Sequence, residues 1–250
     1  MTAGLAEGRF MDLTWHSAEQ THTGKRRHHN EDAVLSWPDA QLWAVADGMG
    51  GHHAGEVASQ AIVSALYALA PVTSLAEQVD AVEDALLGVN LDLRRHAESC
   101  GGRTTIGSTV VAMVCRGRTG VALWAGDSRL YRLRTGQLEL ITRDHNPVSD
   151  LLDSGAVSEA EALAADTNII TRAVGGQHQL HLDIAVFDID VDDIFLLCSD
   201  GLYRELEKHE LVEGLTTPEL EKAADSLLQR CLQGPARDNV SLVIARPEVP

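Results

Sequence analysis

The sequence predicts a single α+β domain in which antiparallel β-sheets are covered by helices. Its 250 residues lie near the upper size for a chain built on one hydrophobic core. Short runs rich in Val, Leu, Ile and Trp are joined by tight turns containing Gly or Pro, which indicates antiparallel pairing. Stretches with helical periodicity lie on either side of these runs, and no repeat or low-complexity linker divides the chain.

The first part of the chain predicts a hairpin followed by two helices. We expect residues 1–12 to be a loose extension, residues 13–246 to form the domain and residues 247–250 to be a tail. Strands are predicted at 33–37 and 41–46, on either side of a Pro38-Asp39 turn. Helical spacing of apolar residues then begins at Gly55 and stops before Pro71, and a second stripe follows, namely Val79, Val82, Leu86, Val89 and Leu93.

The second part of the chain predicts further strands, a small helical flap and a C-terminal helix. The flap is the Ala-rich stretch at about 150–166, in which Ser158 to Glu161 is a capping box that opens a second helix. The polar helix is predicted at about 218–233. The strands are expected at 108–115, 121–125, 130–134, 138–141, 182–189, 194–199 and 240–246.

Composition indicates a folded, acidic protein. Hydrophobic residues make up 44% and charged residues 23% of the chain, and the mean hydropathy is -0.07, as in average globular domains. The 20 basic and 37 acidic residues give a net charge of -17. Such a field repels nucleic acids and anionic membrane surfaces over most of the molecule. We therefore expect no nucleic-acid partner and no membrane insertion.

The cysteines and the N-terminal segment favour a reducing compartment. Cys100, Cys115, Cys198 and Cys231 form no Cys-x-x-Cys pair and have no His spacing typical of zinc, so neither a disulfide framework nor structural zinc is indicated. The first residues lack the apolar core of a signal peptide, and the apolar stretch near 62–71 is too short to span a bilayer. We expect a cytoplasmic protein.

Five acidic residues fall where predicted strands begin or end: Asp32, Asp47, Asp127, Asp200 and Asp238. A carboxylate between an apolar strand and a Gly lies at the rim of a sheet. If the strands share a sheet, these acids converge, and two like charges 4 Å apart cost about 4 kcal/mol at an effective dielectric near 20. Divalent cations relieve that repulsion, and an all-oxygen ligand set suits Mg²⁺ or Mn²⁺.

The competing interpretation is that each Asp shapes a turn. For one Asp-Gly pair taken alone that is the better hypothesis, whereas the joint occurrence of five favours the metal site. A basic segment, Lys25 to His29, immediately precedes Glu31 and Asp32. Guanidinium groups bind two phosphate oxygens at once, but for Lys25 and Arg26 a solvated charge run is the better interpretation.

Eight motifs occur in order between about Leu13 and Arg246, namely GKRRHHNEDA, VADGMGG, GSTVV, AGDSRLY, TRDHN, ITRAVGG, CSDGLYREL and RDNVSLV. As an ordered set they resemble the metal-dependent protein phosphatases of the type 2C (PPM) family in their compact bacterial form. The resemblance implies a four-layer α-β-β-α sandwich of two antiparallel sheets. It also implies an enzyme that uses Mn²⁺ or Mg²⁺ to hydrolyse phosphoserine and phosphothreonine in proteins.

The resemblance assigns roles to individual residues. Asp47 bridges two core ions, the Gly48 carbonyl binds one of them, and Asp200 and Asp238 hold the other. Glu31 and Asp32 hold metal-bound waters, Arg27 clamps the phosphate, and Asn239 supports Asp238 from behind. Asp127, together with Asp200, matches the pair that holds a weaker third ion in bacterial members of the family.

The resemblance also implies a mechanism, in which acidified water attacks phosphorus in line while Arg27 and the ions absorb developing charge. One position departs from the animal members of the family, which carry a proposed acid, His, after Asp-Gly, whereas this chain has Met49. Methionine cannot donate a proton, and His52 and His53 match no catalytic position of the family. A metal-bound water, for example one on the third ion, is the expected donor.

Two alternatives come from other classes. Cys198 with Arg204, and Cys231 with Arg237, satisfy the Cys-x5-Arg spacing of cysteine-dependent phosphatases, but Asp200 and Pro235 make both poor phosphate loops. The second alternative is an inactive phosphatase-like module that binds metal or a phosphoprotein. For the active form, the resemblance implies phosphoprotein substrates, a eukaryotic-like bacterial Ser/Thr kinase as the opposing enzyme, and a monomer.

Overall fold

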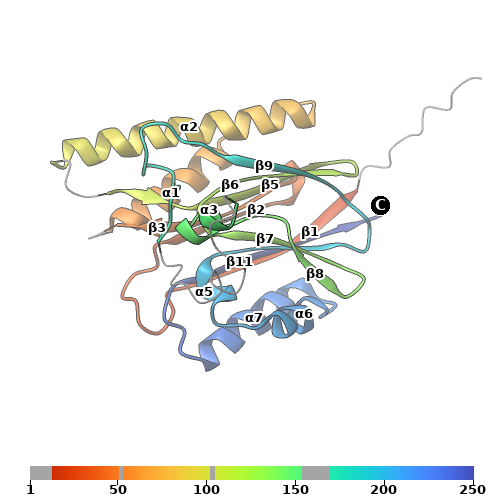
Figure 1. The fold of residues 1–250 in the computed structure, drawn as a ribbon. Helices are drawn as coiled ribbons and strands as arrows, with labels where there is room; N and C mark the ends of the chain where they lie inside the picture. Colours follow the sequence, from red (N-terminus) through yellow and green to blue (C-terminus); the bar gives the residue numbers. More distant parts are fainter. Residues whose placement is uncertain (1–12, 51–52, 102–104, 154–168) are drawn as a thin grey trace, which may run out of the picture.

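The computed structural model describes residues 13–50, 53–101, 105–153 and 169–250. Two antiparallel sheets lie face to face between two layers of helices, as expected (Figure 1). In chain order the helices and strands are β1 (Thr14–His22), β2 (Asp32–Trp37), β3 (Leu42–Met49), α1 (Ala54–Tyr67), α2 (Leu75–Ser99), β4 (Gly107–Ser108), β5 (Val110–Arg116), β6 (Thr119–Ala125), β7 (Arg129–Arg134), β8 (Gln137–Leu140), α3 (Pro147–Asp153), β9 (Asp183–Asp188), β10 (Ile194–Cys198), α5 (Asp200–Tyr203), α6 (Lys208–Leu215), α7 (Leu220–Gln233) and β11 (Val240–Glu248).

Each sheet combines strands that are distant in sequence. One has the order β1-β11-β10-β7-β8, and the other has the order β2-β3-β5-β6-β9 with β4 beside β3. The predicted hairpin is present, with Trp37 opposite Leu42 across a short 3₁₀ turn. Its other end brings Asp32 directly opposite Asp47.

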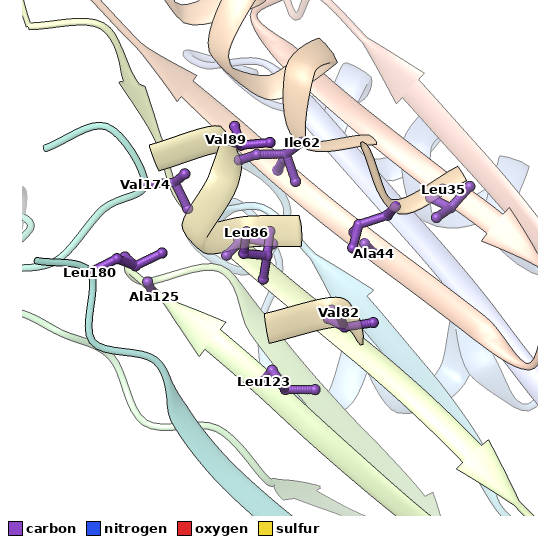
Figure 2. Close-up of a cluster of buried hydrophobic side chains, with 14 of the residues drawn as sticks. Leu35, Ala44, Ile62, Val82, Leu86, Val89, Leu123, Ala125, Val174 and Leu180 are labelled. Atoms are coloured by element: carbon purple, nitrogen blue, oxygen red, sulfur yellow. The ribbon is translucent and has the colours of Figure 1, made fainter. Parts of the chain in front are cut away.

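Three apolar layers hold the sandwich together. Between the sheets, Trp43 and Phe195 are completely buried and both contact Trp15. Helices α1 and α2 cover the β2-β3-β5-β6-β9 sheet, and Figure 2 shows Val82, Leu86 and Val89 of α2 together with Ile62 of α1 in this layer. The amphipathic stripe predicted for the second helix is thus the one that packs. Helices α6 and α7 cover the other sheet (Figure 1).

Three elements were not predicted from sequence. Strand β1 is an edge strand with many polar residues and only two buried ones, Trp15 and Ala18, so its sequence lacks the apolar run that marks a central strand. Helices α5 and α6 are short, at four and eight residues, and too brief to show a clear period. Part of the predicted flap is α3; residues 154–168, with the Ser158 to Glu161 capping box, lie outside the described residues.

None of the helices in the described ranges is both long enough and apolar enough to cross a membrane.

Candidate active site

The predicted acidic residues meet at one end of both sheets. Asp32 begins β2, Asp47 lies near the end of β3, Asp200 follows β10, and Asp238 precedes β11. Cys198 of β10 pairs with both Arg129 of β7 and Leu242 of β11, so the β6–β7 turn that holds Asp127 also lies at this end. Antiparallel pairing thus places strand ends that are far apart in the sequence at one end of the sandwich, and the acids on these strand ends come together.

A cavity of about 660 Å³ opens at this end. Its walls include seven of the nine predicted site residues, and Met49, Arg204, Glu205 and Arg237 also line it. Asp32 and Asp127 lie behind it and are buried, at 4% and 3% exposure. The predicted residues that line the cavity are Arg27, Glu31, Asp47, Gly48, Asp200, Asp238 and Asn239.

The carboxylates are crowded and short of positive charge. Burial, followed by repulsion from Asp32 and Asp200, raises the pKa of Asp47 well above its ordinary value. Burial is also the main cause that raises the pKa of Asp32 to about 7 and the pKa of Asp200. One buried oxygen of Asp32 and one of Asp200, the Oδ1 atoms, have no hydrogen-bond partner among the described residues. Such groups need a cation or a proton.

The donor set fits hard divalent ions. Asp47, Asp200 and Asp238 face the cavity beside Gly48, and carboxylate, carbonyl and water oxygens are the ligands Mg²⁺ and Mn²⁺ prefer. Among the described residues, no three His, Cys, Asp or Glu side chains are already arranged as the ligands of one metal ion. Main-chain oxygen and water are further ligands that such ions accept.

Arg27 is the cation nearest to Asp238. Its Nη2 atom donates to Asp238 Oδ2 at 2.7 Å, and its side chain remains 53% exposed at the mouth of the cavity. The Nη2 atom of the guanidinium is thus held by Asp238, and the other N–H groups remain available to an anionic ligand.

Asn239 holds the Arg27 loop rather than the Asp238 side chain. Its side-chain oxygen accepts from the Glu31 N–H at 2.8 Å, and Nδ2 donates to the carbonyls of Thr23 and His29 at 2.9 Å each. Asp238 is supported by the backbone N–H of Asn239, at 2.9 Å from Oδ1. The side chain therefore joins the loop at 23–31 to the start of β11.

Two serines and a threonine, missed by sequence analysis, position the acids. Ser199 donates its hydroxyl to Asp32 Oδ2 at 2.8 Å. The Asp47 N–H donates to Thr109 Oγ1 at 3.1 Å, and that hydroxyl also bonds to Ser128 at 2.7 Å. All three belong to the motifs GSTVV, AGDSRLY and CSDGLYREL, so their positions in those motifs were the available signal.

Two glycines permit the backbone to approach closely at the site. A Cβ on Gly48 would overlap the carbonyl oxygens of Gly55 and Glu31, and a Cβ on Gly201 would overlap that of Asn239. The end of β3 therefore packs directly on the start of α1, and α5 packs directly on the residues before β11. Both contacts fix the spacing of the acids next to these glycines.

The structure argues against thiolate chemistry. Cys198 is completely buried, and burial strongly raises the pKa of its thiol. Cys231 is also buried, and burial raises the pKa of its thiol. The arginine of the first pattern, Arg204, contacts Asp127 and Asp200 instead. Both thiols therefore act as small apolar groups, as sequence analysis favoured.

Comparison with known proteins identifies the family. The family model described as protein phosphatase 2C matches residues 20–234, and the chain belongs to this family. It is 35% identical over 232 residues to the serine/threonine protein phosphatase PstP of Mycobacterium tuberculosis, covering 91% of this chain and 44% of that protein. It therefore spans less than half the length of that relative. The serine/threonine phosphatase Stp of Listeria innocua is 34% identical, covering 92% and 94% of the two chains.

Solved structures share the fold. The structure of PppA, described as a key regulatory component of the type VI secretion system in Pseudomonas aeruginosa, has a TM-score of 0.87 at 40% identity, covering 94% of this chain and 99% of that one. The catalytic domain of PstP, solved in complex with two manganese ions, has a TM-score of 0.82 at 34% identity, with the same coverages. The four-layer sandwich inferred from sequence is the fold of these relatives.

Proposed function

We propose that the protein is a metal-dependent phosphatase that hydrolyses phosphoserine and phosphothreonine in proteins. The observation that carries this proposal is the cavity itself, which is lined by carboxylates with raised pKa values and by the half-exposed Arg27. Carboxylates alone repel a phosphate, so the site needs cations to bind one. Names of related proteins support the substrate class.

Asp47, the Gly48 carbonyl, Asp200 and Asp238 would hold two Mn²⁺ or Mg²⁺ ions. When bound, such ions supply an acidified water and positive charge for phosphoryl transfer. Arg27 offers the free part of its guanidinium to the phosphate oxygens and keeps its hold on Asp238. Glu31 at the wall and Asp32 behind it accept hydrogen bonds from water in the site, and the loop joined by Asn239 keeps Glu31 and Arg27 in place.

Met49 lines the cavity at the position after Asp47-Gly48. Because its thioether carries no proton, Met49 cannot protonate the leaving alkoxide, and water held in this site is the proposed donor.

The wider setting follows from the same proposal. The substrates are phosphoproteins, opposed by a eukaryotic-like Ser/Thr kinase, and the protein acts as a cytoplasmic monomer. The four cysteines are free, and three of them are buried, which fits a reducing compartment.

The test is hydrolysis of a phosphothreonine peptide by the purified protein after EDTA treatment, with and without added Mn²⁺ or Mg²⁺. We expect activity only with added metal. Metal binding without turnover under any condition would instead favour the inactive phosphatase-like module. Metal-independent activity abolished by Cys198→Ser would revive the thiolate alternative.

A further inference from the structure

Arg204 lies between the two carboxylates that the family resemblance assigns to a third ion. Its Nη2 atom is 3.2 Å from Asp127 Oδ2, and its Nε atom is 3.2 Å from Asp200 Oδ2. One guanidinium thus bridges an acid of the β6–β7 turn and an acid at the start of α5.

The surrounding structure fixes this arrangement. Arg204 is the C-terminal cap of α5, four residues after Asp200, so the helical turn places its side chain beside that carboxylate. The preceding residue, Tyr203, donates its hydroxyl to the Asp127 carbonyl at 3.0 Å, and its ring lies under the Arg129 guanidinium, 3.6 Å from the ring centroid. Asp127 itself is almost fully enclosed, with 4% of its side chain exposed.

Charge at this position agrees with the geometry. The positive charge of Arg204 lowers the pKa values of Asp127 and Asp200, against the larger effect of burial that raises both. Arg204 therefore already supplies part of the compensation that these two acids would otherwise take from a cation.

An ion and the guanidinium cannot share these oxygens. Mg²⁺ lies about 2.0 to 2.1 Å from its oxygen ligands, so an ion on both Oδ2 atoms would occupy the space next to Nε and Nη2. Two cations in such contact repel strongly where water is scarce. Binding of an ion to these two Oδ2 atoms therefore requires Arg204 to leave, and both ion pairs are then lost.

We propose that Arg204 is a built-in replacement for the third ion, so that the protein holds two divalent ions and the guanidinium provides the third positive charge. The inference rests on the proposed function, because it concerns the metal content of the same site. It departs from the sequence-based expectation that Asp127 is a metal ligand. It also implies that the proton for the leaving group does not come from water on a third ion.

The experiment counts Mn²⁺ bound at equilibrium, from the free-ion EPR signal, on the purified protein. The wild type should bind two ions up to millimolar Mn²⁺. Arg204→Met keeps an unbranched side chain as far as the Nε position and removes the charge, and it should bind a third ion at least ten-fold more tightly than the wild type. Arg204→Lys, which keeps a cation, should remain at two.

Two further variants control the measurement. Arg237→Met removes another cavity-lining arginine, one paired with Glu205 at 3.5 Å and 73% exposed, and should leave the count at two. Asp127→Asn should leave the two binding constants of the wild type unchanged, because no ion uses Asp127. This second variant keeps the test decisive even where Arg204→Met does not fold, as judged by circular dichroism.

The outcomes separate the two proposals. Three ions in the wild type, or loss of an ion in Asp127→Asn, would overturn the role of Arg204. A folded Arg204→Met that still binds two ions, with a raised KM for phosphopeptide, would also overturn it and assign Arg204 to phosphate binding. A wild type that binds no ion would overturn the proposed function and this inference with it.

Discussion

Asp200 illustrates how a carboxylate proposed to bind metal opposes stability. Its pKa is raised by burial and by repulsion from Asp238, and its Oδ1 atom lacks a hydrogen-bond partner among the described residues. Asp200→Asn removes that charge at nearly constant volume. We expect turnover of a phosphothreonine peptide to fall at least 1,000-fold, because the site loses an ion ligand, whereas the thermal unfolding midpoint without metal stays the same or rises. Wild-type turnover in this variant would contradict the two-ion assignment.

Arg27 is the second residue that can be tested singly. Its half-exposed guanidinium is proposed to make charged hydrogen bonds to the phosphate, which contribute about 1.5 to 3 kcal/mol. Arg27→Ala should therefore lower kcat/KM about 10- to 150-fold. The matched control is Arg26→Ala, which removes the same side chain from the exposed adjacent position and should change kcat/KM less than two-fold. Equal effects of the two substitutions would assign Arg27 to general electrostatic attraction instead.

Sequence could identify the acids but not the groups that hold them. Asp47 and Asp200 were found because each follows an apolar strand and precedes a Gly, a signal that is local in the chain. Ser199 and Asp32 bond across 167 positions, and Arg204 and Asp127 across 77. Such pairs depend on strand order, which no local pattern specifies. The contacts of Arg204 were consequently outside the reach of sequence reasoning, as were those of Asn239 with Thr23, His29 and Glu31.

At the scale of elements, the contact of α5 with the residues before β11 sets the distance between Asp200 and Asp238. Gly201 makes this contact possible, since a Cβ there would overlap the Asn239 carbonyl oxygen. Gly201→Ala must separate the two elements. We expect at least a ten-fold weaker affinity for Mn²⁺ in calorimetric titration, together with a lower unfolding midpoint.

Gly88→Ala is the control for this substitution. Gly88 lies within α2, and nothing is found within 4 Å of a Cβ built there. Alanine is favoured over glycine in a helix by up to about 1 kcal/mol. This variant should unfold at the same or a slightly higher temperature and bind Mn²⁺ as the wild type does. If both variants lose Mn²⁺ affinity alike, close packing at Gly201 is not what aligns the acids.

The elements differ in how well the sequence predicts them. Helix α2 was predicted because its apolar stripe extends over many turns, and it packs as Figure 2 shows. Strand β1 was not, because its nine residues include His16, Glu19 and Gln20 and only Trp15 and Ala18 are buried, one on each face of the strand. Its position is set by pairing with β11, from Thr14 opposite Glu248 to His22 opposite Val240. Long-range pairing, rather than local preference, makes this segment a strand.

At the scale of the whole molecule, the fold concentrates negative charge at one end of a protein that is already strongly acidic. The net charge is -17, and Asp32, Asp47, Asp127 and Asp200 all have pKa values raised by burial. Self-repulsion of this kind opposes the compact state. Metal-free protein should therefore respond to pH in the opposite sense to a protein whose carboxylates are paired with cations.

The sign follows from proton linkage. In the folded state the pKa of Asp32 is about 7 and that of Asp127 about 6, against an ordinary value of 3.8. Between about pH 4 and 7 the folded protein therefore holds more protons than the unfolded chain, so stability falls as pH rises. Carboxylates with lowered pKa values, such as Asp183 and Asp188, are ionised in both states above pH 5 and do not oppose this trend.

We expect protein in EDTA to unfold at a higher temperature at pH 5.5 than at pH 8.0. A stability difference on the order of 1 to 3 kcal/mol corresponds to roughly 5 °C in a chain of this size. Millimolar Mn²⁺ should raise the midpoint more at pH 8.0, where the carboxylates are ionised and bind it without releasing protons. Asp32→Asn in EDTA should flatten the pH profile, because it removes the buried acid whose pKa is about 7. If the unfolding midpoint of the wild type in EDTA were higher at pH 8.0 than at pH 5.5, the pKa values of the buried acids would not be raised in the folded state, and this prediction would be wrong.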